Sequence, residues 1–371
     1  MQFSLNVAPL KSALDLAVVN SNISKFFEKS TVVELSVQGN KLFVNTQATA
    51  LLSEVAIPGH NVDNGEASAI VDCVLFKQLV STIDGNEMTL DFQDNFLVVK
   101  CGKSKFNVPK LLSDEDAASL DKPVSDSDVA DSLCGELHVD VWKYIQSHQL
   151  YAVALSQINK VYTRVWVNND KGVLTGDPTL SIFTYQPSSD LDSSCLVSST
   201  IVNLLATLDS GTKLYRASDT SYLVVMDTDA FSFRAQFNVD HEDDTGIGVY
   251  DSDMILDMVL DDTQKGVKVP KSKMGSTVKQ AALFSSASNP YVYVSAGSDG
   301  VRMTSDNVNC LLSSDTSDVE YNVKFALSDV DMVVSHMETE DVELYPIVKE
   351  GEVFGIRLVS GNLVALVGGA E

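Results

Sequence analysis

Cysteine is scarce in this sequence of 371 residues, and its spacing is irregular. The five cysteines never form a Cys-x-x-Cys pair; they are Cys73, Cys101, Cys134, Cys195 and Cys310. An odd number without paired spacing indicates a reducing compartment and argues against both a disulfide framework and a zinc site. We therefore expect the protein to need no metal ion or other cofactor.

Long apolar runs are also missing. No stretch approaches the ~20 apolar residues that span a membrane, so we expect no membrane partner. The opening MQFSLNVAPLKSALDLAV lacks a basic n-region and carries Lys11 and Asp15 within its apolar part, which argues against a secretory signal peptide. Together with the unpaired cysteines, this predicts a cytoplasmic protein.

Motifs for catalysis and nucleotide binding are absent as well. The sequence has no HExxH, no GxSxG and no phosphate-binding GxxxxGK[ST], and its five histidines are dispersed. Two acidic segments, 113–133 and 240–253, are predicted to be solvated linkers. The second contains His241-Glu242-Asp243-Asp244, which leaves open the alternative of an enzyme with an acidic metal site. We predict that the protein is not an enzyme.

Basic residues are few: 26 lysines and arginines stand against 51 acidic residues, for a net charge of −25. This balance argues against free binding to nucleic acid, but it allows a protein that gathers its few lysines on one surface. Residues 265–284, KGVKVPKSKMGSTVKQAALF, contain five lysines and no acidic residue. They indicate either a surface that meets a polyanion or an exposed helix face that is basic by chance.

One pattern of helix and strands occurs three times in the sequence. Residues 71–112 read as a helix whose buried face holds Val74, Leu75, Leu79, Val80 and Ile83, an Asp-Gly stop, and then strands of alternating polarity. Residues 199–237 and 325–358 repeat this order, with helix ends spaced 125 and 129 residues apart at Asp84, Asp209 and Glu338. A period of this length indicates domains, not a solenoid.

The sequence therefore predicts an α+β fold of three tandem similar domains, each with two helices packed on antiparallel sheet. The predicted domains are 1–120, 134–245 and 250–371. The predicted helices are 8–20, 71–84, 139–154, 199–209, 270–284 and 327–337. Residues 174–180 are predicted to be a turn that precedes a strand at 181–185.

Three stretches carry a resemblance to a known family. The opening MQFSLNVAPLKSALDLA is similar to its strand-then-helix start, residues 71–111 resemble the end of its first domain, and VLTGDPTLSIFTY (173–185) resembles its second-domain motif, usually written TDGHRLA. The family is the DNA polymerase sliding clamp of the bacterial beta-clamp type, in a diverged form that a phage genome could carry. The resemblance covers most of the chain.

The resemblance implies a processivity factor that encircles duplex DNA without reading its sequence and tethers the replicative polymerase. Two copies would join head to tail in a closed ring with helices lining the hole. A clamp loader would load the ring in the cytoplasm, which would be the host's cytoplasm if a phage encodes the protein. Basic residues on or beside these helices would contact DNA: Lys11, Lys25, Lys29, Lys77, Lys143, Lys160, Arg164, Lys271, Lys273 and Lys279. The helix at 327–337 departs from this scheme, since it carries Asp329 and Asp331 and no lysine.

The resemblance also implies two further surfaces. The subunit interface would join Phe106 and Val108 of one copy to Leu283 and Phe284 of the other, although Leu283 and Phe284 could equally be core residues. A pocket for short linear peptides would use Thr175, Pro178, Leu180, Val249, Leu366 and Val367. The pocket motif departs from the family, because Asp and Gly are exchanged and Pro178-Thr179 replace His-Arg, and the chain ends in LVGGAE where the family has Met-Pro-Met-Arg-Leu.

One further alternative has no ring. A structural or virion interaction protein built of repeated α+β domains would show the same repeats without any effect on a polymerase.

Overall fold

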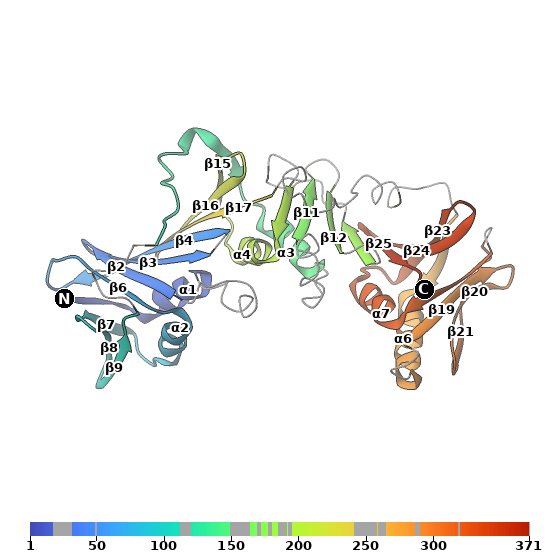
Figure 1. Ribbon diagram of the computed structural model, residues 1–371, viewed down its shortest axis with the longest axis horizontal. Helices are drawn as coiled ribbons and strands as arrows, with labels where there is room; N and C mark the ends of the chain where they lie inside the picture. The colour runs from blue at the N-terminus through green and yellow to red at the C-terminus, as the bar shows by residue number, and fades with distance from the viewer. Residues whose placement is uncertain are drawn as a thin grey trace. The chain divides into compact units, whose positions relative to one another are not determined.

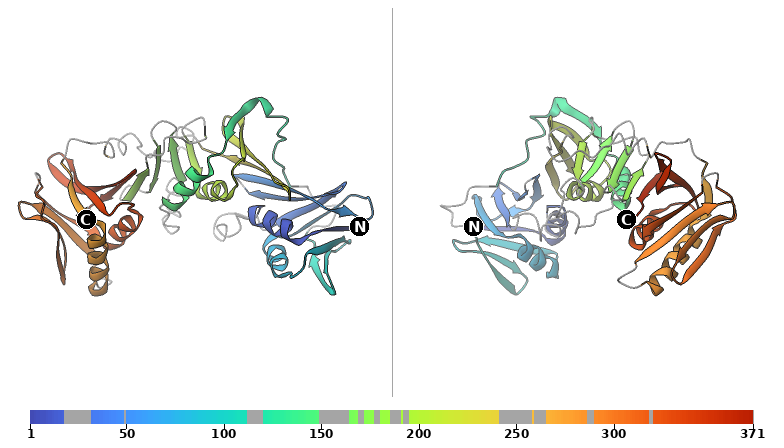
Figure 2. Two further views of the ribbon diagram at one scale, coloured as in Figure 1. Left: turned by 180° about the vertical axis from the view of Figure 1, so that it is seen from behind. Right: turned by 45° about the vertical axis from the view of Figure 1, so that its right-hand side comes forward.

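The computed structural model describes residues 1–17, 32–48, 50–111, 120–148, 164–168, 172–176, 180–184, 191, 195–240, 258, 265–285, 290–317 and 320–370. The chain divides into two compact units (Figures 1 and 2). Unit 1 comprises Met1–Lys143, Asp190–Asp192 and Val197–Asp240; unit 2 comprises Tyr144–Ser189, Ser193–Leu196 and His241–Glu371. Both are α+β with antiparallel sheets, as the sequence predicts.

Six repeats of strand, helix and three strands make up the described chain. The helices are α1 (Val7–Ala17), α2 (Cys73–Thr82), α3 (Val139–His148), α4 (Ser199–Thr207), α6 (Lys271–Phe284) and α7 (Leu327–His336). The strands that precede them are β1 (Gln2–Asn6), β6 (Ala67–Asp72), β10 (Leu133–Glu136), β14 (Cys195–Ser198), β18 (Val267–Pro270) and β22 (Tyr321–Ala326). The threefold pattern of the sequence is thus a sixfold pattern in the structure.

Three strands follow each helix. They are β2 (Val32–Gln38), β3 (Lys41–Ala48) and β4 (Leu51–Pro58); β7 (Glu87–Phe92), β8 (Phe96–Cys101) and β9 (Ser104–Pro109); β11 (Arg164–Asn168), β12 (Gly172–Gly176) and β13 (Leu180–Thr184); β15 (Lys213–Ser218), β16 (Ser221–Asp227) and β17 (Ser232–Asn238); β19 (Tyr291–Gly297), β20 (Gly300–Ser305) and β21 (Val308–Ser313); β23 (Asp341–Lys349), β24 (Glu352–Ser360) and β25 (Leu363–Gly368). A short extra strand, β5 (His60–Asn61), pairs with β1.

Neighbouring repeats exchange their first strands. β1 pairs with β7 and β6 with β2; β10 lies beside β15 and β14 beside β11; β18 pairs with β23 and β22 with β19. The last strands of four repeats pair with one another, β4 with β17 and β13 with β25, and so extend two sheets to eight strands each. The last strands of the other two repeats, β9 and β21, each form the edge of a smaller sheet.

Four of the described helices pack in two pairs. α1 contacts α2 in unit 1 and α6 contacts α7 in unit 2, and Figure 1 shows each pair side by side. The core of unit 2 combines Met274 and Val278 of α6 and Val330 of α7 with one face of the sheet strands, including Ile356 and Val367. Strands β17 and β19 bury every second residue, as expected where one sheet face meets a core.

Helix α2 begins where its sequence provides a cap. Asp72 has extended backbone angles, and its carboxylate accepts a hydrogen bond of 2.7 Å from the backbone N–H of Leu75, which satisfies one of the donors left free by the first helical turn. The prediction for its buried face is wrong at two positions. Phe76 is fully buried, whereas Val74 and Leu75 are 42% and 48% exposed.

The first predicted linker is docked on the sheet over its second half. Val129 packs in a small apolar cluster with Tyr215, Leu223 and Val225 on unit 1's large sheet. Asp121 also exchanges hydrogen bonds with Gln47 of β3, at 2.8 and 3.1 Å. Residues 120–132 are therefore attached to the sheet at Asp121 and Val129, while most of their residues stay exposed, as expected of a solvated segment.

The predicted turn at 174–180 is also wrong over much of its length. Residues 174–176 end β12 and Leu180 begins β13, so that residues 177–179 alone lie between two paired strands. Val173 pairs with Thr184 and Gly176 with Ser181 in this hairpin. The second predicted linker, 240–253, lies outside the described residues apart from Asp240.

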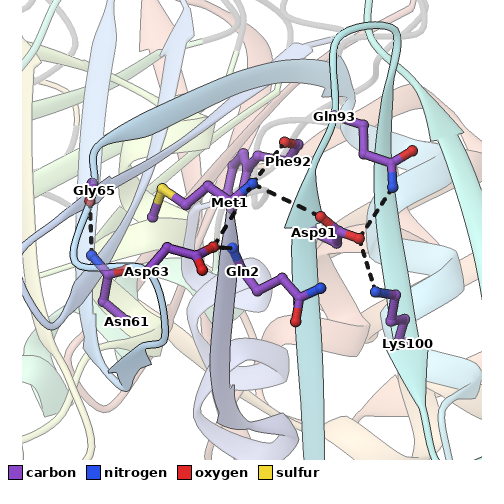
Figure 3. A network of polar contacts seen from close by, with 9 residues as sticks. All are labelled: Met1, Gln2, Asn61, Asp63, Gly65, Asp91, Phe92, Gln93 and Lys100. Carbon is purple, nitrogen blue, oxygen red and sulfur yellow. Dashed lines mark hydrogen bonds and ion pairs between the residues drawn. The ribbon is translucent and has the colours of Figure 1, made fainter.

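A polar network joins the start of β1 to the β7–β8 hairpin (Figure 3). Asp91 of β7 is 8% exposed and accepts hydrogen bonds of 2.8 Å from Lys100 and 3.1 Å from Gln93. The Met1 ammonium lies 3.9 Å from the same carboxylate and donates to the carbonyl oxygen of Phe92. Burial opposes ionisation of Asp91, but these donors and charges outweigh it and lower the pKa of the carboxyl.

Candidate nucleic-acid interface and neighbouring surfaces

The described helices differ in charge from the rest of the chain. The six α-helices contain six lysines and four aspartates, a net charge of +2, whereas the whole chain carries −25. No histidine is counted in these charges. The acidic residues are thus concentrated outside these helices, which leaves the helices the surfaces best suited to a polyanion.

In unit 1, the three predicted DNA-binding lysines that the structure describes are engaged within the protein. Lys11 of α1 donates a 3.0 Å hydrogen bond to the carbonyl oxygen of Ile83, just after α2. Lys77 of α2 forms an ion pair with Asp15 of α1, with 3.0 Å between Nζ and Oδ1. Lys143 of α3 is 3.7 Å from Asp140, one turn earlier on the same helix.

In unit 2, the three lysines of α6 differ from one another. Lys271 is the first residue of the helix, and its ammonium donates to the carbonyl oxygen of Met337, just after α7. Lys273 and Lys279 are exposed, and the side-chain ammonium of neither has a hydrogen-bond or ion-pair partner among the described residues. α6 contains no acidic residue. These two lysines are therefore the ones that the structure leaves available for an external anion.

Four of the predicted DNA-binding residues cannot be placed in this surface. Lys25, Lys29 and Lys160 lie outside the described residues, and Arg164 begins β11, where the backbone alone is described. α7 carries Asp329 and Asp331 and no lysine, and its departure from the predicted basic scheme stays a prediction.

The predicted interface residues are mostly exposed. Leu283 and Phe284, at the end of α6, are 80% and 60% exposed, so they are not core residues. Phe106 on the edge strand β9 is 38% exposed, but its neighbour Val108 is 2% exposed and packs in the core. Val108 therefore cannot contact a partner through its side chain in this conformation.

Sequence reasoning missed two exposed apolar residues in the same region. Val74 and Leu75 lie at the start of α2, and the strand before α2 is bridged to the end of β9 between Val71 and Lys110. The sequence offered a signal, because Val74, Leu75, Phe76, Leu79 and Val80 are too many apolar residues for one face of a short helix. Some of them had to face outward.

The predicted peptide pocket is partly described. Thr175 is the next-to-last residue of β12. Leu180 is the first residue of β13 and pairs with Val367 of β25. Val367 is 1% exposed within the helix-side core of unit 2, whereas Leu366 points to the opposite face. Pro178 and Val249 lie outside the described residues, so the structure does not bring the predicted set together.

Leu366 has charged and aromatic neighbours on its face of the sheet. Its cross-strand partner Arg357 is 6% exposed and lies 4.3 Å above the ring of Tyr345, the next residue in the row. The Tyr345 hydroxyl donates a 2.6 Å hydrogen bond to Glu343, and this bond together with burial raises the pKa of the phenol. Arg357 and Leu366 are 6% and 7% exposed, so neither side chain is open to solvent in this structure.

The described residues show no group of three or more His, Cys, Asp and Glu side chains suited to a metal ion, and the candidate run His241–Asp244 lies outside them. Within the same residues, no helix is long and apolar enough to cross a membrane.

Comparison with known proteins gives a structural match without a sequence match. No protein-family model matches the sequence, and no curated protein matches it. Solved structures match along the whole chain: a putative DNA polymerase III beta subunit from Eubacterium rectale (14% identity, TM-score 0.78, 100% of both chains), the DNA polymerase III beta subunit of Thermotoga maritima (12%, 0.75, 100% of this chain and 99% of that one), and the Helicobacter pylori beta clamp bound to a DNA ligase peptide (14%, 0.69, 100% of both). The chain has the fold of the bacterial beta clamp.

Proposed function

We propose that this protein is a sliding clamp: a non-enzymatic processivity factor that closes into a ring around duplex DNA and tethers a DNA polymerase. Its three domains would be 1–120, 134–245 and 250–371, each built from two of the six repeats. The observation that carries the proposal is the pair of unmatched last strands, β9 and β21.

The strand pattern supports a head-to-tail assembly. Four repeats already pair their last strands, and β4 and β17 do so over six residue pairs. β9 and β21 have six residues each and lie at sheet edges. An open edge offers free backbone groups to another strand, so β9 of one copy and β21 of a second copy would complete the pattern. Because the two edges differ, the contact is heterologous. Such a contact forms a ring when the rotation from one copy to the next closes on the first copy.

Apolar residues lie beside both edges. Phe106 lies on β9, and Val74 and Leu75 are on the helix next to it; Leu283 and Phe284 end α6, which packs against β21. Exposed apolar side chains beside a strand edge indicate a surface that is covered in the assembled protein. We propose that these five residues meet between two copies.

The helix charges suit the proposed DNA. Sequence-independent binding needs cations near phosphates and no base readout, and the α-helices carry a net positive charge within an acidic chain. The acidic residues outside the α-helices would repel DNA from the other surfaces of the protein. The Helicobacter pylori clamp was solved with a DNA ligase peptide, and we propose that polymerase and clamp loader bind this protein in the cytoplasm through peptides near Leu366.

Sedimentation velocity at micromolar concentration tests the assembly, with negative-stain microscopy of the same sample. We expect a mass of twice 40.1 kDa and ring-shaped particles with a central hole. Leu283→Glu should give monomers, because it places a charge in the proposed contact. The matched control Val348→Glu, at an exposed apolar residue (38%) on β23, should stay dimeric. A wild-type monomer at all concentrations would contradict the ring and favour a structural interaction protein.

A further inference from the structure

We infer that α6 supplies the dominant phosphate contact of this protein through Lys273 and Lys279, and that the lysines of α1, α2 and α3 add little to its affinity for DNA. The inference rests on the proposed function, since it identifies which part of the DNA-facing surface holds the duplex.

Carboxylates of the same chain neutralise two of the other candidate lysines, Lys77 and Lys143. Lys77 is 29% exposed and forms its 3.0 Å ion pair with Asp15, and Lys143 lies 3.7 Å from Asp140. Each pair has no net charge, so a phosphate that approaches either lysine also approaches a carboxylate. The attraction of the lysine for phosphate is largely cancelled by the repulsion from its partner.

Hydrogen bonds to backbone carbonyl oxygens hold two more of the candidate lysines, Lys11 and Lys271. Lys11 donates to Ile83 and Lys271 to Met337, in both cases to the residue that directly follows the partner helix. A second bond joins the Lys271 backbone N–H to the carbonyl oxygen of Glu340 at 2.8 Å. These lysines keep their charge, but a phosphate contact would require them to leave positions in which they tie one helix to another.

The ammonium groups of Lys273 and Lys279 have neither a carboxylate partner nor a backbone carbonyl partner among the described residues. Both are exposed, no acidic residue shares their helix, and the small polar Ser276 lies between them. The neighbouring helix α7 carries Asp329 and Asp331, and neither forms an ion pair with Lys273 or Lys279 in the described structure. Ser276 donates to the carbonyl oxygen of Lys273 at 3.0 Å, so its hydroxyl does not compete for the ammonium groups.

The inference predicts a shallow salt dependence. Each lysine that neutralises a phosphate contributes about −0.9 to the slope of log K against log salt. Two such lysines per chain, and two chains in the proposed ring, give a slope of about −3 to −4. Equal use of all the candidate lysines would give a much steeper slope.

The test compares two double variants that remove the same charge. Fluorescence anisotropy with a short labelled duplex would measure affinity over a series of salt concentrations for the wild type, for Lys273→Gln with Lys279→Gln, and for Lys77→Gln with Lys143→Gln. We expect the α6 pair to lose at least about tenfold in affinity and to flatten the salt slope, while the control pair changes affinity by less than about threefold. Circular dichroism and sedimentation would confirm that both pairs fold and assemble like the wild type.

Two results would overturn the inference, and they are distinguishable. Equal losses in the two double variants would show that α6 is not dominant, while the ring and its DNA binding stand. A wild-type protein that forms no dimer and binds no duplex even at low salt would overturn the proposed function, and the inference with it.

Discussion

The guanidinium of Arg234 lies 2.7 Å from the carboxylate of Asp126, which joins β17 to the segment that precedes β10. The other terminal nitrogen of Arg234 is 4.0 Å from Glu54 on β4. Because β4 pairs with β17, this arginine lies where two repeats share a sheet. The segment 120–132 is thus fixed across the junction by charge as well as by the packing of Val129.

Replacement of Arg234 by Met should destabilise unit 1 by about 1 kcal/mol, since Met keeps much of the side-chain volume and removes the charge. A double-mutant cycle with Asp126→Asn should give a coupling energy of about 0.5–1 kcal/mol, as expected for a partly exposed pair. Urea denaturation of the wild type, the two single variants and the double variant measures this coupling energy. Strictly additive effects would show that the ion pair contributes nothing to stability.

Asp91 should make stability depend on pH in acid. Its pKa is lowered in the folded protein, so the unfolded chain binds the proton more readily. The stabilisation by this group is therefore complete above the unfolded value of about 4 and is lost as the pH falls through the lower folded value. Asp91→Asn should lower the melting temperature at neutral pH, and the difference from the wild type should shrink below about pH 4.

The exposed Asp94, in the turn that follows Asp91, provides the control. Asp94→Asn should leave the melting temperature nearly unchanged at every pH. If Asp91→Asn were destabilising by the same amount at pH 7 and pH 3, the effect would come from packing and not from ionisation.

Cys73 should resist alkylation in the folded protein. Burial, with a smaller contribution from Asp72 and against an opposing one from Lys77, raises the pKa of its thiol to about 12. The thiolate is the reactive form, and the side chain is 2% exposed. With iodoacetamide at pH 8, followed by peptide mass spectrometry, the exposed Cys134 should be modified well before Cys73. Modification of both at one rate would indicate that α2 opens readily.

The sequence predicts the fold class and most element positions because apolar periodicity and turn residues are local signals. The predicted helix at 270–284 matches α6 (Lys271–Phe284), and that at 327–337 matches α7 within a residue. The sixfold repeat was not predicted, because the exchange of first strands, such as β1 with β7, joins residues as far apart in the sequence as Gln2 and Asp91. Such pairing leaves no periodic trace in the sequence.

The candidate site was harder to predict than the fold. Charge type identifies lysines, but the partners that neutralise them come from other helices, as Asp15 does for Lys77. Likewise, Phe106 and Val108 lie two residues apart and so on one face of β9, yet Val108 is buried and Phe106 is 38% exposed. These distinctions depend on tertiary contacts, which composition and spacing do not contain.

The face that α2 buries gives the sharpest contrast between neighbouring residues. Phe76→Ala should cost about 3–5 kcal/mol, because it removes a fully buried ring and leaves a cavity. Leu75→Ala should change unfolding by less than about 0.5 kcal/mol, because that side chain is 48% exposed. Leu75→Ala should instead weaken dimerisation, so that the sedimentation midpoint moves to higher protein concentration while the unfolding midpoint of the monomer stays in place. The opposite ranking in urea denaturation would mean that α2 is rotated and that Leu75 belongs to the core.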